Sequence, residues 1–141
     1  MKKVLPLFVF FSSLFLTSCA NDDEIAFFYE RVPIDGVEVP EQFFRNQEVA
    51  LKISYKRPSD CYSFNNFNYE SLANQRTVTV INVVVENDSV CKGLSEKKIV
   101  EVPLNFRVGN EESYVFRFWQ GEDEDGDDQY KIIEIPVIKE E

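Results

Sequence analysis

The stretch that decides the fold class is residues 100–108, which read VEVPLNFRV. Apolar side chains occupy every second position from Val100 to Val108, and mostly polar residues fill the positions between them. A period of two predicts a β-strand with one buried face and one wetter face. Pro103 belongs to the wetter set. Because proline has no N–H to donate to a sheet, it indicates an edge strand or a bulge.

The same pattern extends to both sides of this stretch, over residues 49–56, 114–119 and 132–138. Residues 77–85 differ, because they are rich in β-branched side chains and become apolar at successive positions. This composition predicts a central strand covered on both faces. Shorter strands are expected over 25–32 and 37–39, with Pro33 and the turn dipeptide Asp35-Gly36 between them.

One further strand changes phase along its length. Tyr62 and Phe64 share one face, whereas Phe67 and Tyr69 fall in the opposite phase, so the intervening Asn65-Asn66 pair indicates a bulge or turn. No window sustains helical periodicity. Seven or eight short strands with turn signals between them predict a single antiparallel sandwich over residues 25–141. A small β-barrel is the alternative architecture.

The N-terminus has the three-part plan of a secretory signal over residues 1–18. Lys2 and Lys3 supply the positive end, residues 4–16 are apolar apart from two serines, and Thr17 and Ser18 are small. Thirteen apolar residues rise only about 20 Å as a helix, whereas the bilayer core needs about 30 Å, which disfavours a spanning helix. An ordinary cleaved signal and an uncleaved anchor are the alternatives considered.

The residues at the cleavage site, Leu16-Thr17-Ser18-Cys19, resemble the lipobox of bacterial lipoproteins. The resemblance implies cleavage between Ser18 and Cys19 and a diacylglyceryl group on the Cys19 thiol. Stable anchoring needs at least two acyl chains, which this modification supplies. Residues 19–24 then form an acidic tether. Its Asn21-Asp22-Asp23-Glu24 run resembles the surface-export signals of Bacteroidota-type lipoproteins, and implies an outer-membrane protein that faces the cell surface.

A wider resemblance covers roughly residues 45–140. The segments around Cys61, Thr77, Cys91 and Phe116 look like small uncharacterised lipoproteins of the Bacteroidota, which carry an immunoglobulin-like sandwich behind the lipobox. The resemblance implies that sandwich and supports a pairing of the two cysteines. It implies no catalytic activity.

The cysteines of the chain number three. If Cys19 carries lipid, Cys61 and Cys91 remain as an even pair in an oxidising compartment, which predicts a disulfide. A closed loop of this size stabilises a fold by about 3–4 kcal/mol. Two free buried thiols are the alternative.

Charge and composition exclude several classes of function. Without residues 1–18 the chain has a formal charge of −12, which repels nucleic acid and excludes it as a partner. There is no histidine, no CxxC, no GxSxG and no glycine-rich phosphate loop. We therefore expect no enzyme and no cofactor.

Dense acidic sequence over residues 122–128 raises the question of a cation site. Asp123, Asp125 and Asp127 are the candidate Ca²⁺ ligands, because hard cations prefer several oxygens. The spacing departs from an EF-hand loop, and Asp125-Gly126 is a turn dipeptide. A charged hairpin loop is the favoured interpretation.

Two further features bear on binding and modification. The chain is rich in aromatic residues, most of which should be core, although some could form an exposed platform for sugars: Phe27, Phe28, Tyr29, Phe43, Phe44, Tyr62, Phe64, Phe67, Tyr69 and Trp119. Asp88-Ser89-Val90 resembles a short O-glycosylation motif, which makes Ser89 a candidate modification site. The sequence thus favours a membrane-anchored interaction or adhesion module with an unknown protein or glycan partner. The alternatives are a carbohydrate- or Ca²⁺-binding lipoprotein and, less directly, a protease inhibitor.

Overall fold

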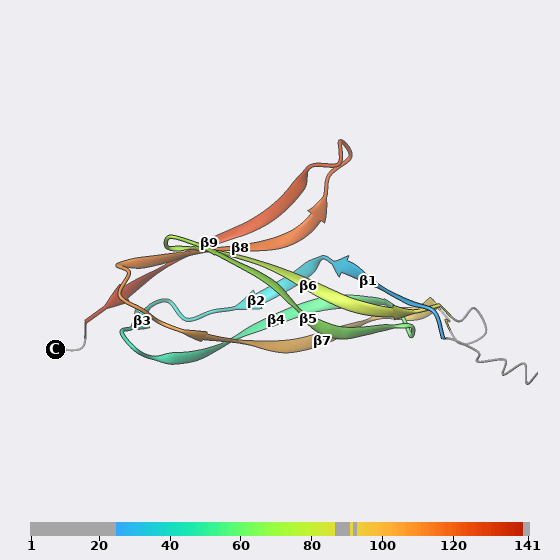
Figure 1. The fold of residues 1–141 in the computed structure, drawn as a ribbon, viewed down its shortest axis with the longest axis horizontal. Helices are drawn as coiled ribbons and strands as arrows, with labels where there is room; N and C mark the ends of the chain where they lie inside the picture. Colours follow the sequence, from blue (N-terminus) through green and yellow to red (C-terminus); the bar gives the residue numbers. More distant parts are fainter. Residues whose placement is uncertain (1–24, 87–90, 92, 140–141) are drawn as a thin grey trace, which may run out of the picture.

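The computed structural model describes residues 25–86, 91 and 93–139, which form an all-β domain (Figure 1). No helix occurs in these ranges. The strands are β1 (Phe27–Val32), β2 (Ile34–Glu38), β3 (Phe43–Phe44), β4 (Glu48–Ser59), β5 (Tyr62–Leu72), β6 (Gln75–Val85), β7 (Gly93–Arg107), β8 (Ser113–Glu122) and β9 (Asp128–Ile138). The predicted all-β class is confirmed.

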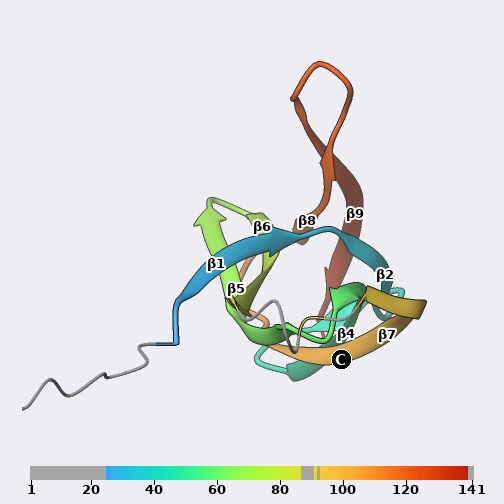
Figure 2. The ribbon, with the colours of Figure 1, turned by 90° about the vertical axis from the view of Figure 1, so that its right-hand side faces the viewer.

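The strands form two sheets. The larger has the order β1-β6-β8-β9-β3, with β5 added on β6, and the smaller has the order β2-β4-β7. Viewed end on, the strands curl around the core in the manner of a half-barrel (Figure 2). The predicted strand count was slightly low, because β3 is only two residues long and was not predicted.

The expectation of purely antiparallel sheets was wrong for two pairings. β6 runs parallel to β8 over Gln75–Val78, and β3 runs parallel to β9 at Phe43–Phe44. Parallel neighbours need a crossover connection. The chain provides one for β6 and β8, because it leaves the larger sheet after β6, passes along β7 in the smaller sheet and then returns. The sheets are therefore mixed.

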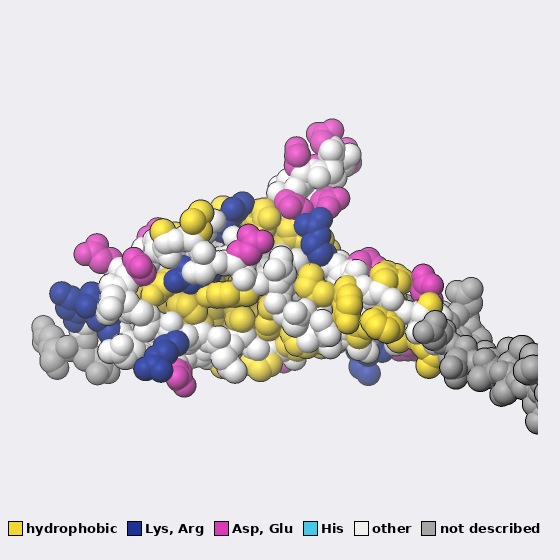
Figure 3. All heavy atoms as spheres, in the orientation of Figure 1, with side chains coloured by type: hydrophobic (Ala, Val, Ile, Leu, Met, Phe, Trp, Pro, Cys, Tyr) yellow, Lys and Arg dark blue, Asp and Glu magenta, His cyan; other side chains and the backbone are white. Residues whose placement is uncertain are grey.

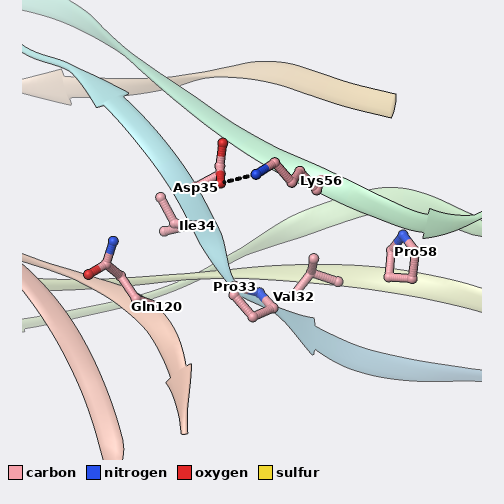
Figure 4. A pocket seen from close by; sticks show the side chains of 7 residues that line it. All are labelled: Val32, Pro33, Ile34, Asp35, Lys56, Pro58 and Gln120. Atoms are coloured by element: carbon pink, nitrogen blue, oxygen red, sulfur yellow. Dashed lines mark ion pairs between the residues drawn. The ribbon is translucent and has the colours of Figure 1, made fainter. Parts of the chain in front are cut away.

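The first strand switches from one sheet to the other at Pro33. β1 pairs with β6 in the larger sheet, and β2 pairs with β4 in the smaller sheet. Figure 4 shows Pro33 between Val32 and Ile34 at this crossing. Proline suits the position because a ladder that ends there needs no N–H. The predicted break at Pro33 is confirmed.

The core lies between the sheets and is dominated by aromatic rings. Phe43, Phe106, Tyr114 and Phe116 form a cluster with ring centroids 4.9–6.2 Å apart. Most of these pairs meet edge to face, the arrangement that aromatic quadrupoles favour. Aliphatic residues such as Leu51, Ile53, Val78 and Val80 fill the space around them, each completely buried.

The β6 strand is the centre of the larger sheet. β5 covers one edge over almost its whole length. On the other edge, β8 pairs with Gln75–Val78 and β1 pairs with Val80–Val85. The partner strand therefore changes at Thr79, and we call this change of partner the hand-over. A central strand was predicted here and is confirmed. The prediction that both faces are covered was wrong for the described residues, since the outward Ile81, Val83 and Val85 are only half-buried.

The sequence predicted a bulge at Asn65-Asn66 and an edge strand at Pro103, and the structure contains both. The register of β5 against β6 shifts between Phe64 and Asn66, which confirms the predicted bulge. β7, which contains Pro103, pairs with β4 alone among the described strands, as expected for an edge strand.

A disulfide joins Cys61, in the turn between β4 and β5, to Cys91, which precedes β7. The two Cα atoms are 5.1 Å apart, within the usual range for a cystine. The predicted pairing is confirmed. The bond ties the β4–β5 turn to the connection that carries the chain from β6 to β7.

The core contains one poorly satisfied polar pair. Tyr55 and Asn82 are both fully buried and face the interior from opposite sheets. Neither the Tyr55 hydroxyl nor the Asn82 amide completes a hydrogen bond within the described residues. Burial raises the pKa of Tyr55, and the nearby Asn82 and Arg57 oppose part of that rise. An unpaired buried polar group costs about 1–3 kcal/mol.

Replacing this pair with apolar side chains of similar shape should therefore stabilise the protein. We expect the double variant Tyr55→Phe/Asn82→Leu to raise the free energy of unfolding by about 1–3 kcal/mol, since neither buried polar group remains to be desolvated. Urea denaturation followed by Trp119 fluorescence measures this. A double variant less stable than the parent chain would contradict the assignment and indicate that a bound water satisfies both groups.

Candidate functional site

The outward face of the larger sheet carries a row of apolar side chains. Val78, Val80 and Val84 point into the core, so the alternate residues Ile81, Val83 and Val85 point outward. Directly opposite residues of an antiparallel pair share a face. Tyr29 lies opposite Val83, and Phe27 lies opposite Val85. We call this surface the outer patch: Phe27, Tyr29, Ile81, Val83 and Val85.

The aromatic residues of the outer patch are the most exposed part of it. Phe27 is 58% exposed and Tyr29 is 60% exposed. Their rings meet edge to face, with centroids 5.9 Å apart and planes at 80°. The rings are therefore not a coplanar pair, although each presents a face or an edge to solvent. An uncovered apolar surface of this kind commonly marks a binding site.

A shallow groove adjoins the outer patch where β1, β6 and β5 lie side by side. Its volume is about 390 Å³, and the side chains that line it are Tyr29, Asn65, Asn66, Phe67, Asn68 and Ile81. The β5 bulge places Asn66 opposite Ile81 and Asn68 opposite Thr79, so that both amides belong to the outward face. Asn65 Nδ2 donates to Asn66 Oδ1 at 3.1 Å. No lining residue is charged.

A second cavity, of about 360 Å³, lies at the Pro33 crossing (Figure 4). Val32, Pro33 and Ile34 form its apolar side, and Lys56 and Asp35 pair across it at 2.9 Å. These two charges satisfy each other. The cavity is thus a by-product of the strand crossing, with one ion pair across it. None of its lining side chains is arranged for acid–base or nucleophilic chemistry.

A network of side chains fixes β1 to the base of the β8–β9 hairpin. The Arg31 guanidinium lies 4.4 Å from the centroid of the Trp119 ring, and Trp119 Nε1 donates to Asp128 Oδ1 at 2.7 Å. Arg31 also pairs with Asp128 at 3.0 Å and with Glu122. The hydrogen bond from Trp119 and the charge of Arg31 lower the pKa of the Asp128 carboxyl. The network lies where β8 separates from β6.

Beyond this network the β8–β9 hairpin projects from the body of the protein (Figure 1), and acidic side chains gather at its tip (Figure 3). A bulge at Trp119–Gly121 redirects β8, and Gly121 adopts a φ of +108° that L side chains rarely accept. Asp125 and Gly126 lie in the loop between the strands, with Gly126 at a φ of +85°. The predicted hairpin loop is confirmed.

The three candidate Ca²⁺ ligands, Asp123, Asp125 and Asp127, lie in this loop but do not converge on a cation site. Asp123 Oδ1 accepts hydrogen bonds from the backbone N–H groups of Asp125 and Asp127 at 3.0 and 2.9 Å, and Oδ2 accepts from Gln129. Its carboxylate thus organises the turn itself. Throughout the ranges that the structure describes, no three carboxylate, histidine or cysteine side chains gather as metal ligands would.

The remaining aromatic candidates divide by exposure. Phe43 and Trp119 are buried, and four are half-buried, namely Phe44, Tyr62, Phe64 and Phe67. Phe28 and Tyr69 are exposed but lie outside the outer patch. Of the predicted platform, only Phe27 and Tyr29 are therefore brought together on an open face.

Other sequence-based expectations lie outside the described residues. These are the signal over residues 1–18, its cleavage between Ser18 and Cys19, lipidation of Cys19, the tether over 19–24 and modification of Ser89. Several residues of this surface were not predicted as functional: Arg31, Asn66, Asn68 and Ile81. The phase change at Asn65-Asn66 could have predicted that the Asn66 and Asn68 amides face outward, since the bulge decides which β5 residues lie on that face.

Comparison with known protein families, with curated proteins and with solved structures found no match to this chain. In the part of the chain that the structure describes, no helix is long and apolar enough to cross a membrane.

The network at the hairpin base should respond to acid. Asp128 has a folded-state pKa below its usual value, so its ionised form adds stability above the ordinary carboxyl pKa, and that stability is lost as pH falls through the lowered value. Because Trp119 is the only tryptophan and donates to Asp128, its fluorescence should change on acidification in this range. Asp128→Asn should remove the transition. An unchanged acid transition in that variant would assign it to another carboxyl.

Proposed function

We propose that this protein is a non-enzymatic interaction module, anchored to the bacterial outer membrane through lipid on Cys19 and facing the cell surface. The observation that carries the interaction role is the outer patch. Its two aromatic rings are more than half exposed, and β6 presents outward apolar residues that no described strand covers. Leaving such a surface open costs solubility, so a partner that covers it explains its presence.

Binding fits this surface better than catalysis does. The groove beside Tyr29 is lined by amide, aromatic and aliphatic side chains. Apart from the Tyr29 hydroxyl, none of these side chains can act as a general acid, a general base or a nucleophile. The carboxylates of the described residues lie largely on exposed strands and on the projecting hairpin, where they keep the surface charged and discourage self-association.

The position of the outer patch along the chain would place it close to the proposed anchor. β1 begins at Phe27, eight residues after Cys19. At full extension the connecting chain spans at most about 3.5 Å per residue, so a lipid on Cys19 would hold the start of β1 within about 30 Å of the membrane. The lipobox and the acidic run after it support lipidation and export.

For the fold we propose an elaborated immunoglobulin-like sandwich. Its support is the first strand, which serves one sheet as β1 and the other as β2, together with an aromatic core between two sheets. The parallel pairings of β6 with β8 and of β3 with β9 are elaborations of that plan.

Metabolic labelling tests the anchor. Cells that express the full chain and are fed radiolabelled palmitate should incorporate label into it, and Cys19→Ala should lose the label, because the thiol that accepts the diacylglyceryl group is gone. Ser13→Ala is a matched control that changes the signal but keeps the lipobox. Label retained by the Cys19→Ala chain would refute the anchor.

Site-specific photo-crosslinking tests the interaction role in intact cells. A benzophenone amino acid at position 29 should give an adduct of higher mass, whereas the same group at position 132 should not. Tyr29 and Ile132 are equally exposed, at 60% and 62%, but Ile132 lies on β9, away from the outer patch. Adducts of equal yield from both positions, or none from position 29, would contradict a binding role for this surface.

A further inference from the structure

We infer that the groove beside Tyr29 binds a neutral carbohydrate, with the Tyr29 ring stacking on one sugar and the Asn66 and Asn68 amides bonding to its hydroxyls. This inference rests on the proposed role of the protein as an interaction module and names the ligand class of that site. Three features of the groove support it: its lack of charge, its exposed ring and its amides.

The absence of charge in the groove restricts the ligand to a neutral one. Charged residues make up 28% of the chain, yet none lines this groove. No cation lines the groove to receive an anionic ligand, because the neighbouring Arg31 is already paired with Glu122 and Asp128, and the acidic protein would repel such a ligand. A cationic ligand would find no carboxylate to pair with.

The exposed ring of Tyr29 favours a ligand with an apolar face. Its ring is 60% exposed and meets the Phe27 ring edge to face, so part of its surface is open to a ligand. The face of a pyranose that presents only C–H groups buries apolar area on such a ring. Ile81 extends the apolar floor beside it.

The amides of β5 complement hydroxyl groups. An asparagine side chain has two donors and an acceptor, so it can both give and receive hydrogen bonds, as the hydroxyls of a sugar do. Asn66 and Asn68 alternate along the strand after the bulge and lie on the same face as Ile81. Their spacing of about 7 Å, expected for residues two apart on a strand, matches the scale of one sugar unit.

The shape of the groove favours a polysaccharide over a small enclosed sugar. The groove is shallow and widely open to solvent, so a bound chain can extend beyond it. The second exposed tyrosine offers a contrast, because the cavity beside Tyr69 is also lined by Arg76 and Arg107. That charged cavity makes Tyr69 a matched control.

Native affinity electrophoresis tests the inference with the full chain in mild non-ionic detergent. The strong negative charge of the protein drives it through gels that contain mannan, laminarin, xylan or dextran as neutral probes, or polygalacturonate as the anionic probe. We expect at least one neutral polysaccharide to retard the protein, and polygalacturonate not to do so.

The variants separate stacking from hydrogen bonding. Tyr29→Ala should weaken retardation by about tenfold, because one stacking contact is lost, whereas Tyr29→Phe should keep most of it. Asn68→Asp should weaken it by replacing two donors with a charge. Tyr69→Ala should leave it unchanged.

Retardation by none of the neutral polysaccharides would overturn the inference, as would retardation that Tyr29→Ala does not reduce or an equal effect of polygalacturonate. The assay does not depend on where the chain is anchored. Its failure would therefore remove the glycan site and leave the anchored module to the labelling and crosslinking experiments.

Discussion

The pairing of β6 on both edges is the constraint on which the rest of the structure depends. β5 holds one edge, while β8 and β1 divide the other, with Thr79 between their segments. Because no single strand covers that second edge, β8 is free to leave the sheet after Phe118 and β1 is free to leave it after Val32. The point at which each strand leaves the sheet gives rise to one further structural feature.

The departure of β8 produces the projecting hairpin, and the departure of β1 produces the crossing at Pro33. Arg31 connects the two, because its side chain stacks on Trp119 and pairs with the carboxylates at the hairpin base. The hydrogen bond that Trp119 donates to Asp128 holds the base of the hairpin in this direction. The same hand-over places β1 beside β6 with Tyr29 on the outward face, where β5 supplies the amides of the groove.

Much of the strand pattern could be predicted from the sequence, since it depends on neighbouring residues. Alternation located most strands. Pro33 marked a break between strands, Pro103 marked an edge, and the phase change at Asn65-Asn66 marked the bulge. The parity of the cysteines indicated the Cys61–Cys91 bond. Each of these signals depends on neighbouring residues or, for the disulfide, on the number of cysteines.

The parallel pairings and the open outer face could not be predicted in the same way. Which strands become neighbours depends on contacts far apart in the chain, and the apolar character of Ile81, Val83 and Val85 is equally consistent with burial under another layer. Tyr29 was included among ten aromatic candidates, but only the register against β6 separates it from the core rings. The acidic loop was predicted as a charged hairpin, but the role of Asp123 in holding its turn together depends on side-chain geometry that the charge pattern does not specify.

Amide hydrogen exchange of β6 tests the hand-over most directly. We expect Val80–Val85 to exchange as slowly as Gln75–Val78, because β1 replaces β8 along that edge and keeps the strand paired on both sides. Rapid exchange confined to Val80–Val85, as in an edge strand, would show that β1 does not complete the sheet and would contradict this pairing.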